Sequence, residues 1–190
     1  RIKGISMARK SYELDMTNGT IMDKLITFAI PLMLSSLLQL MFNAVDTVVV
    51  GRFTGNEALA AVGATVSLIH MFTNLFIGIS LGTNVLVARY TAARMDREVH
   101  DVVHTAILFS FISGVGMIFF GFFLARPSLL LLGTPENVID QAVLYMQIYF
   151  VGVPFFMLYT FGAAILRAVG DTRRPLIYLV ISGIANVILN

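Results

Sequence analysis

The sequence predicts an all-α integral membrane protein, folded as a polytopic bundle of helices. Of its 190 residues, 57% are hydrophobic and 13% are charged, whereas a soluble domain carries roughly 25% charged residues. The mean hydropathy is +0.85. A soluble domain of this length could not bury so much apolar surface in one core. The apolar residues also gather in long segments with short polar connectors between them, which is the pattern of membrane spans.

The apolar segments predict four complete spans and the start of a fifth. We expect a cytoplasmic N-terminal segment over residues 1–23 and a partial transmembrane bundle over 24–190. Since the chain begins at Arg1 rather than at Met, and its last apolar segment stops in mid-pattern at Asn190, we interpret it as a fragment of a longer membrane protein. The predicted helices span about 25–50, 57–88, 100–125, 135–168 and 174–190.

Local signals support these helices in chain order. The second helix contains Gly78-xxx-Gly82 and the third Ser110-xxx-Gly114, small-residue pairs that allow close helix approach. The fourth begins at Thr134-Pro135-Glu136, where Thr can cap and Pro suits the first turn. Pro154 predicts a kink in the same helix. The fifth begins near Pro175, after the polar connector LRAVGDTRRP.

The basic residues predict the orientation of the bundle. If the spans alternate in direction, Arg52 and Arg126 fall on one side of the membrane. An excess of Lys and Arg marks cytoplasmic loops, so we expect the opposite side and the N-terminus to be cytoplasmic. That side receives Arg1, Lys3, Arg9, Lys10, Lys24, Arg89, Arg94, Arg97, Arg167, Arg173 and Arg174.

Several classes of function find no support. A net charge of +2 is too small to indicate nucleic-acid binding, and the absence of Cys excludes thiolate metal sites. His100 and His104 are four residues apart, a spacing that can share a metal, but no further ligands follow in a pattern, so an interfacial surface is the better interpretation. We therefore expect no metal site, no cofactor, no nucleotide-binding glycine loop and no enzyme activity.

A stripe of polar residues lies along the first predicted helix. Its members follow one another at steps of four, four, four, four and three residues, which places them on one face. Such a stripe should face protein or water, because unpaired polar groups are costly in hydrocarbon. Proline lacks an N–H and leaves one carbonyl of its helix without a donor, so it adds a bend point. The stripe consists of Thr27, Pro31, Ser35, Gln39, Asn43 and Asp46.

Asp46 is the acidic residue that lies well inside an apolar segment, and two interpretations compete. It lies 22 residues into the first predicted helix, so it could simply be solvated near the outer headgroups. Alternatively, it faces a water-filled cavity and binds a proton or a cation. Since carboxylates within membrane spans usually serve a function, the second interpretation is favoured.

The stretch VDTVVVGRFTGNEALAAVG, residues 45 to 63, resembles the signature of the MATE (multidrug and toxic compound extrusion) transporters. That family combines an early proline in its first helix, an aspartate followed by Thr, a Gly, and an Ala-Ala-Val/Leu-Gly start to its second. LRAVGDTRRP is similar to the family's link between helices four and five, and NVILN to its fifth-helix motif. The resemblance covers residues 12 to 190.

The resemblance implies twelve helices in two lobes, of which this chain would supply most of the N-terminal lobe and lack the C-terminal one. It implies a multi-pass antiporter of the bacterial plasma (inner) membrane that exports drug-like, often cationic, organic compounds as protons or sodium ions enter. Asp46, Asn186 and Asn190 fall on its cation-coupling positions, and Asn190 stands where several members carry an acid. Gln39, Phe42 and Asn43 fall near its substrate cavity, and Pro31 is the expected conformational hinge.

Two alternatives remain at this stage. A lipid-linked oligosaccharide flippase of the same superfamily would share the lobe architecture, but such proteins need a basic cavity for pyrophosphate. No Lys or Arg lies deep in the predicted helices, which argues against that function. The other alternative is a truncated membrane protein that transports nothing, since one lobe alone cannot alternate access.

Overall fold

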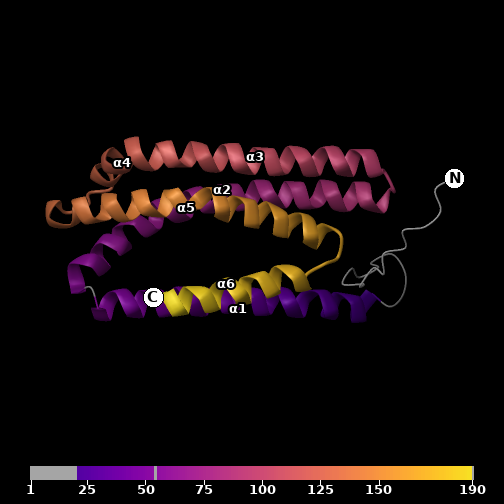
Figure 1. The fold of residues 1–190 in the computed structure, drawn as a ribbon, viewed down its shortest axis with the longest axis horizontal. Coiled ribbons are helices and arrows are strands. Elements are labelled where there is room, and N and C mark those ends of the chain that lie inside the picture. Colours follow the sequence, from indigo (N-terminus) through magenta and orange to yellow (C-terminus); the bar gives the residue numbers. More distant parts are fainter. Residues whose placement is uncertain (1–20, 54, 190) are drawn as a thin grey trace.

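The computed structural model describes residues 21–53 and 55–189, except for the side chains at 46, 50, 53, 55–59, 187 and 189. This part of the chain is built of helices without strands (Figure 1). The predicted all-α class is therefore confirmed, and four of the described helices are long and apolar enough to cross a membrane. The helices are α1 (Ile21–Phe53), α2 (Gly55–Ala92), α3 (Asp96–Phe123), α4 (Ala125–Leu131), α5 (Glu136–Ala168) and α6 (Arg173–Leu189).

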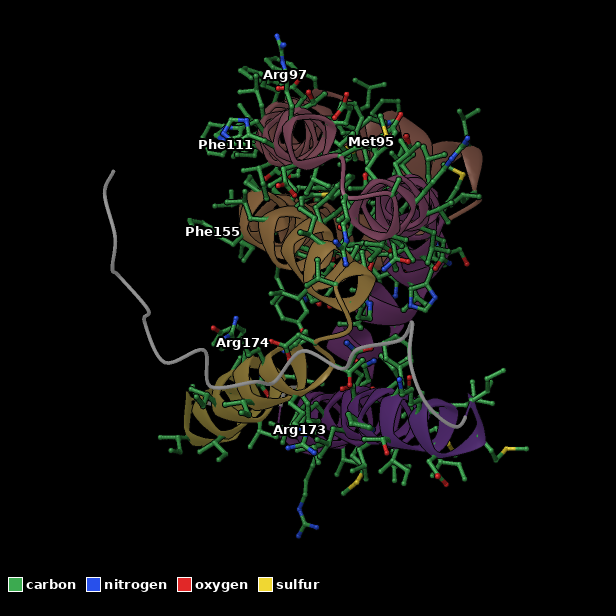
Figure 2. All side chains as sticks on the ribbon, turned by 90° about the vertical axis from the view of Figure 1, so that its right-hand side faces the viewer. Met95, Arg97, Phe111, Phe155, Arg173 and Arg174 are labelled. Atoms are coloured by element: carbon green, nitrogen blue, oxygen red, sulfur yellow. The ribbon has the colours of Figure 1, made fainter. Side chains whose placement is uncertain are left out.

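The helices separate into two groups. Helices α2, α3 and α5 pack closely on one another, and α1 packs chiefly on α6. Figure 1 shows α1 and α6 side by side along one edge of the molecule, and Figure 2 shows the same grouping end on. We call these groups the α2–α3–α5 trio and the α1–α6 pair. The α1–α2 junction and the α5–α6 turn connect them.

Small residues bring α3 and α5 together within the trio. A Cβ on Gly114 would lie 2.6 Å from the Cα of Pro154, and a Cβ on Gly121 would lie 2.7 Å from the Cβ of Phe150. The predicted close approach at Ser110-xxx-Gly114 is therefore confirmed. A Cβ at Gly78 or Gly82 would have no neighbour within 4 Å, so that pair does not make a close contact here.

Aromatic rings fill the space beside these contacts. Phe72 of α2, Phe120 of α3 and Phe150 of α5 have centroids 4.3, 5.6 and 6.1 Å apart. Such pairs stabilise a core beyond the area that they bury. Between α2 and α5, the side-chain amide of Asn84 donates a 2.7 Å hydrogen bond to the carbonyl of Ala164. The trio is thus held by apolar packing and a polar cross-link.

Three turns end their helices with the same hydrogen-bond pattern. After α5, Gly170 has a φ of +87° and the amide of Asp171 donates to the carbonyl of Leu166 at 2.9 Å. Gly133 takes the same left-handed position after α4, and Arg94 takes it after α2. This is the Schellman arrangement, which glycine favours because it has no Cβ. Arg94 adopts it at a cost of about 1 kcal/mol.

The segment between α3 and α5 differs from the prediction. The sequence predicts that the third helix reaches about residue 125 and that a short polar connector follows it. Instead α3 ends at Phe123 and the short helix α4 follows. Ala125 and Leu129 are four residues apart and fully buried, so one face of α4 packs on the bundle. Thr134 does not cap α5, since Pro135 occupies the N-cap position without a side-chain hydrogen bond.

The described basic residues gather at one end of the bundle. Because α1, α3 and α6 run in one direction in Figure 1 and α2 and α5 in the other, the start of α1, the α2–α3 turn and the α5–α6 turn share an end. Arg52 and Arg126 lie at the other end. The end that carries most of the charge holds Lys24, Arg89, Arg94, Arg97, Arg167, Arg173 and Arg174.

Candidate cation-coupling site

The polar stripe of α1 is buried at its start and exposed toward its end. Pro31 is the buried member, Ser35 is half-buried, and Gln39 and Asn43 are exposed. The face of α1 that packs inward also carries Phe28, Leu38 and Phe42, all half-buried. The first half of the stripe therefore lies against protein, while the predicted substrate-cavity residues Gln39 and Asn43 border open space.

Hydroxyl groups on the stripe and next to it donate hydrogen bonds within α1. Thr27 donates to the carbonyl of Asp23 at 2.7 Å, and Ser35 donates to the carbonyl of Pro31 at 2.8 Å. Thr47 donates to the carbonyl of Asn43, also at 2.8 Å. Each hydroxyl donates its hydrogen bond to the carbonyl four residues earlier, so it does not donate to another helix. The hydroxyl oxygens can still accept a hydrogen bond.

Pro31 lies in the interior of a continuous helix, about a third of the way along α1. The helix α1 runs from Ile21 to Phe53 without a break, and its axis is straight in Figure 1. A proline in a helix interior removes one hydrogen bond and weakens the helix at that point. The structure thus contains the weakened position that a hinge requires, in an unbent form.

Phe42 of α1 and Gly183 of α6 form a close contact between the two helices. A Cβ on Gly183 would overlap the ring of Phe42, so only glycine admits the ring at this place. The two helices run in the same direction, because each begins at the same end of the bundle (Figure 1). One turn beyond Phe42 is position 46, and nearly one turn beyond Gly183 is Asn186. Positions 46 and 186 therefore lie within about one helical turn of each other along the α1–α6 pair.

Not every predicted site residue can be placed. Asn186 is exposed on α6. Asp46 lies on α1, but its side chain is outside the described part of the structure, and so is the whole of Asn190. The roles assigned to these three residues, and to Gln39, Phe42, Asn43 and Pro31, stay predictions.

The histidine pair lies away from this region. His100 and His104 are exposed near the start of α3, with ring centroids 4.1 Å apart, and His100 Nδ1 is 3.8 Å from Asp101. Among the described residues, no group of three or more potential metal ligands exists.

Sequence reasoning missed a buried acidic residue at the α5–α6 turn. Asp171 is fully buried at the α5–α6 turn, although the polar connector around it suggested a solvated loop. Its Oδ1 accepts from the backbone N–H groups of Arg173 and Arg174, both at 3.1 Å, and its Oδ2 lies 3.1 Å from Nε of Arg174. Asp171 thus caps the start of α6. The spacing of Asp171 ahead of Arg173 was the available signal.

Comparisons with known proteins bear on this arrangement. The chain is 35% identical over 162 residues to the Bacillus subtilis protein named "Probable multidrug resistance protein YoeA", covering 85% of this chain and 35% of that protein. It is 28% identical over 166 residues to the "FAD transporter" of Shewanella oneidensis, covering 87% of this chain and 36% of that protein. The chain therefore spans about a third of the length of these relatives.

The fold also matches solved structures. A multidrug resistance MATE family transporter of the MOP superfamily, in an outward-facing conformation, superposes with a TM-score of 0.75 at 26% identity. The match covers 87% of this chain and 36% of that one. The MATE-type fold predicted from the sequence is confirmed. The profile of the MatE family matches residues 31–190, most of the sequence, and the chain accordingly belongs to the MatE family.

Proposed function

We propose that this chain forms part of a cation-coupled antiporter that exports drug-like or cationic organic compounds. The proposal rests on family membership and on one observation of geometry. The Phe42–Gly183 contact supports a site in which positions 46 and 186 lie within about one turn of each other on two adjacent helices. A carboxylate and an amide from neighbouring helices can together hold a sodium ion, and the carboxylate can instead take up a proton.

The distribution of charge favours a cationic cargo. In the described helices, Lys and Arg lie near helix ends, from Lys24 and Arg52 in α1 to Arg167 in α5. The middle of the bundle thus lacks the basic groups that a pyrophosphate or another anionic group would need. The same observation argues against the flippase alternative.

The orientation follows from the same distribution. The basic end of the bundle is the cytoplasmic end under the positive-inside rule. The N-terminus is then cytoplasmic, and the protein is a multi-pass component of a bacterial plasma membrane. The second lobe of the transporter would come from a part of the protein other than these 190 residues.

Coupling requires that the ion bind two conformations unequally. In the proposed mechanism, charged or sodium-bound Asp46 favours a straight α1. Protonation of Asp46 removes that preference and allows α1 to bend at Pro31, where one helical hydrogen bond is already missing. Movement of α1 would carry Gln39, Phe42 and Asn43 with it and so reshape the cavity.

The test compares two carboxylates in the natural full-length protein. Dye efflux is measured from cells under imposed proton or sodium gradients, with Asp46→Asn against wild type. We expect Asp46→Asn to abolish coupled efflux, and the gradient that drives the wild type identifies the ion. Asp101→Asn on α3 is the matched control, because its side chain is 71% exposed and at the basic end. Efflux by Asp46→Asn at the wild-type rate would refute the proposed coupling.

The hinge has a separate test. Pro31→Ala restores an N–H to the interior of α1 and stiffens the helix, so we expect slower transport from a protein that still folds and inserts. Normal transport by a correctly inserted Pro31→Ala protein would show that α1 does not bend at this position during transport.

A further inference from the structure

A small cavity lies at the basic end of the bundle, between the last turns of α5 and the first turns of α6. Its volume is about 180 Å³, and it is half open to the outside. Apolar groups line it, including Leu158, Gly162 and Leu166 of α5 and Pro175 and Tyr178 of α6. Pockets for drug-sized ligands are usually larger, about 300–1,000 Å³. The cavity fits a thin aliphatic chain better than a drug.

Glycine keeps this cavity open. A Cβ added at Gly162 would have no neighbour within 4 Å, so the empty space begins directly at the backbone of α5. The hydroxyl of Tyr159 in α5 donates a 3.3 Å hydrogen bond to the carbonyl of Pro175 in α6, so this bond joins the two helices that line the cavity. The cavity is therefore a built feature of the α5–α6 turn rather than a gap between loose side chains.

An unneutralised cation stands beside the cavity. Arg167 is half-buried in the last turn of α5, and its electrostatic neighbour is Tyr159, which lines the cavity. Within the described residues, Arg167 has no carboxylate partner, whereas Arg126 pairs with Asp140 at 2.8 Å. A half-buried guanidinium without an anion is unfavourable. An anion that reached it would form strong, charge-assisted hydrogen bonds.

The apolar cavity and the neighbouring cation together suit an amphiphilic ligand with an apolar chain and a negatively charged headgroup. We propose that the α5–α6 turn binds an acidic phospholipid, with the headgroup phosphate on Arg167 and part of an acyl chain in the cavity beside Gly162. Arg167 ends a membrane-spanning helix, which is the level of the headgroups. Basic pockets between spanning helices are typical sites for acidic lipids. Arg173 and Arg174 nearby would repel a cationic drug.

The experiment uses the natural full-length protein in detergent, with lipid binding counted by native mass spectrometry. Phosphatidylglycerol and phosphatidylcholine of equal chain length are titrated in parallel. We expect the wild type to bind phosphatidylglycerol about tenfold more tightly, which is about 1.4 kcal/mol. Arg167→Gln should remove this preference. Gly162→Leu, which fills the cavity, should weaken the binding of both lipids.

Each variant has a matched control. Arg173→Gln removes an exposed charge at the same end of the bundle and should keep the preference. Gly152→Leu makes the same change on α5 at a glycine that also has open space around it, and it should bind both lipids as the wild type does. Soluble glycerol phosphate carries the head without the chain, so it should not compete.

Four results would overturn the proposal. The first is wild-type lipid affinity in both Arg167→Gln and Gly162→Leu. The second is an equal loss of preference in Arg167→Gln and Arg173→Gln, since that would indicate a general surface charge. The third is competition by glycerol phosphate as strong as that of the lipid. The fourth is a wild-type protein that binds neither lipid, together with a Gly162→Leu variant that is less stable than the wild type. That combination would indicate that another part of the protein fills the cavity.

Discussion

The α2–α3–α5 trio and the α1–α6 pair are built from similarly apolar helices but bury them to different extents. In an apolar 18-residue stretch of each helix, 17% of the residues are buried in α2, 28% in α3 and 44% in α5, whereas none of the described residues is buried in that of α1. In the trio, glycines of α3 lie against the backbone or Cβ atoms of α5. In the pair, one glycine receives the far end of a phenylalanine ring.

This difference in packing predicts different roles for the two groups of helices. Elements that move in transport are expected to be those with few buried contacts. Every predicted site residue that the structure describes lies in the α1–α6 pair, and none lies in the trio. We therefore expect the trio to be the more rigid part and the α1–α6 pair to be the part that shifts, so substitutions in the two regions should fail in different ways.

The largest effect is expected in the trio. Gly114→Ala places a methyl group against the backbone of Pro154, so α3 and α5 must move apart. We expect a loss of about 2–3 kcal/mol in the free energy of unfolding, at the upper end for overpacking. The measurement is the temperature at which half of the solubilised protein loses its monodisperse gel-filtration peak. Gly116→Ala is the control, because open space surrounds that position. Equal melting of the two variants would contradict the close contact.

A smaller effect is expected at the turn that joins the two regions. Asp171→Ala removes the cap of α6 and the ion pair with Arg174, so we expect a loss of about 1–2 kcal/mol. Asp171→Asn keeps an oxygen that can accept the two backbone N–H groups, so it should lose less. The same melting assay ranks the variants. If Asp171→Asn melts as low as Asp171→Ala, the ion pair rather than the cap holds the turn.

Much of the fold could be predicted because a long apolar run in the sequence directly indicates a membrane-spanning helix. Apolar runs predicted α1, α2, α3 and α5, and small residues predicted the approach at Gly114. The runs could not predict α4, since a seven-residue helix depends on packing of Ala125 and Leu129 against other helices. They also could not predict that Asp171 is buried, because a polar connector gives the same signal whether solvent or protein surrounds it.

The residues of the candidate site could be predicted from the sequence, but their arrangement across two helices could not. Helical periodicity placed the polar stripe on one face of α1, and resemblance to a family pointed to Asp46 and Asn186. Which residue of α6 lies beside which residue of α1 is a tertiary property. It depends on the ring of Phe42 fitting over Gly183, which no pattern within either helix records.

The smallest effect on stability, and the sharpest test of the comparison, is expected in the pair. In Gly183→Ala the new methyl group meets only the far end of the Phe42 ring. The ring can rotate away from the methyl group, toward the exposed side of α1. We expect a loss of less than about 1 kcal/mol in stability, because the obstacle is a movable side chain rather than backbone. Transport should fall at least tenfold, since the register between positions 46 and 186 changes.

A double-mutant cycle separates this register effect from a general disturbance. Phe42→Leu shortens the side chain that the methyl group would strike, so the pair Phe42→Leu with Gly183→Ala should transport as well as Phe42→Leu alone. Gly82→Ala in the trio, at a glycine with open space around it, should change neither melting nor transport. If Gly183→Ala instead melts as low as Gly114→Ala, the pair is as rigidly packed as the trio. The proposed motion of α1 and α6 against a fixed scaffold would then lose its physical basis.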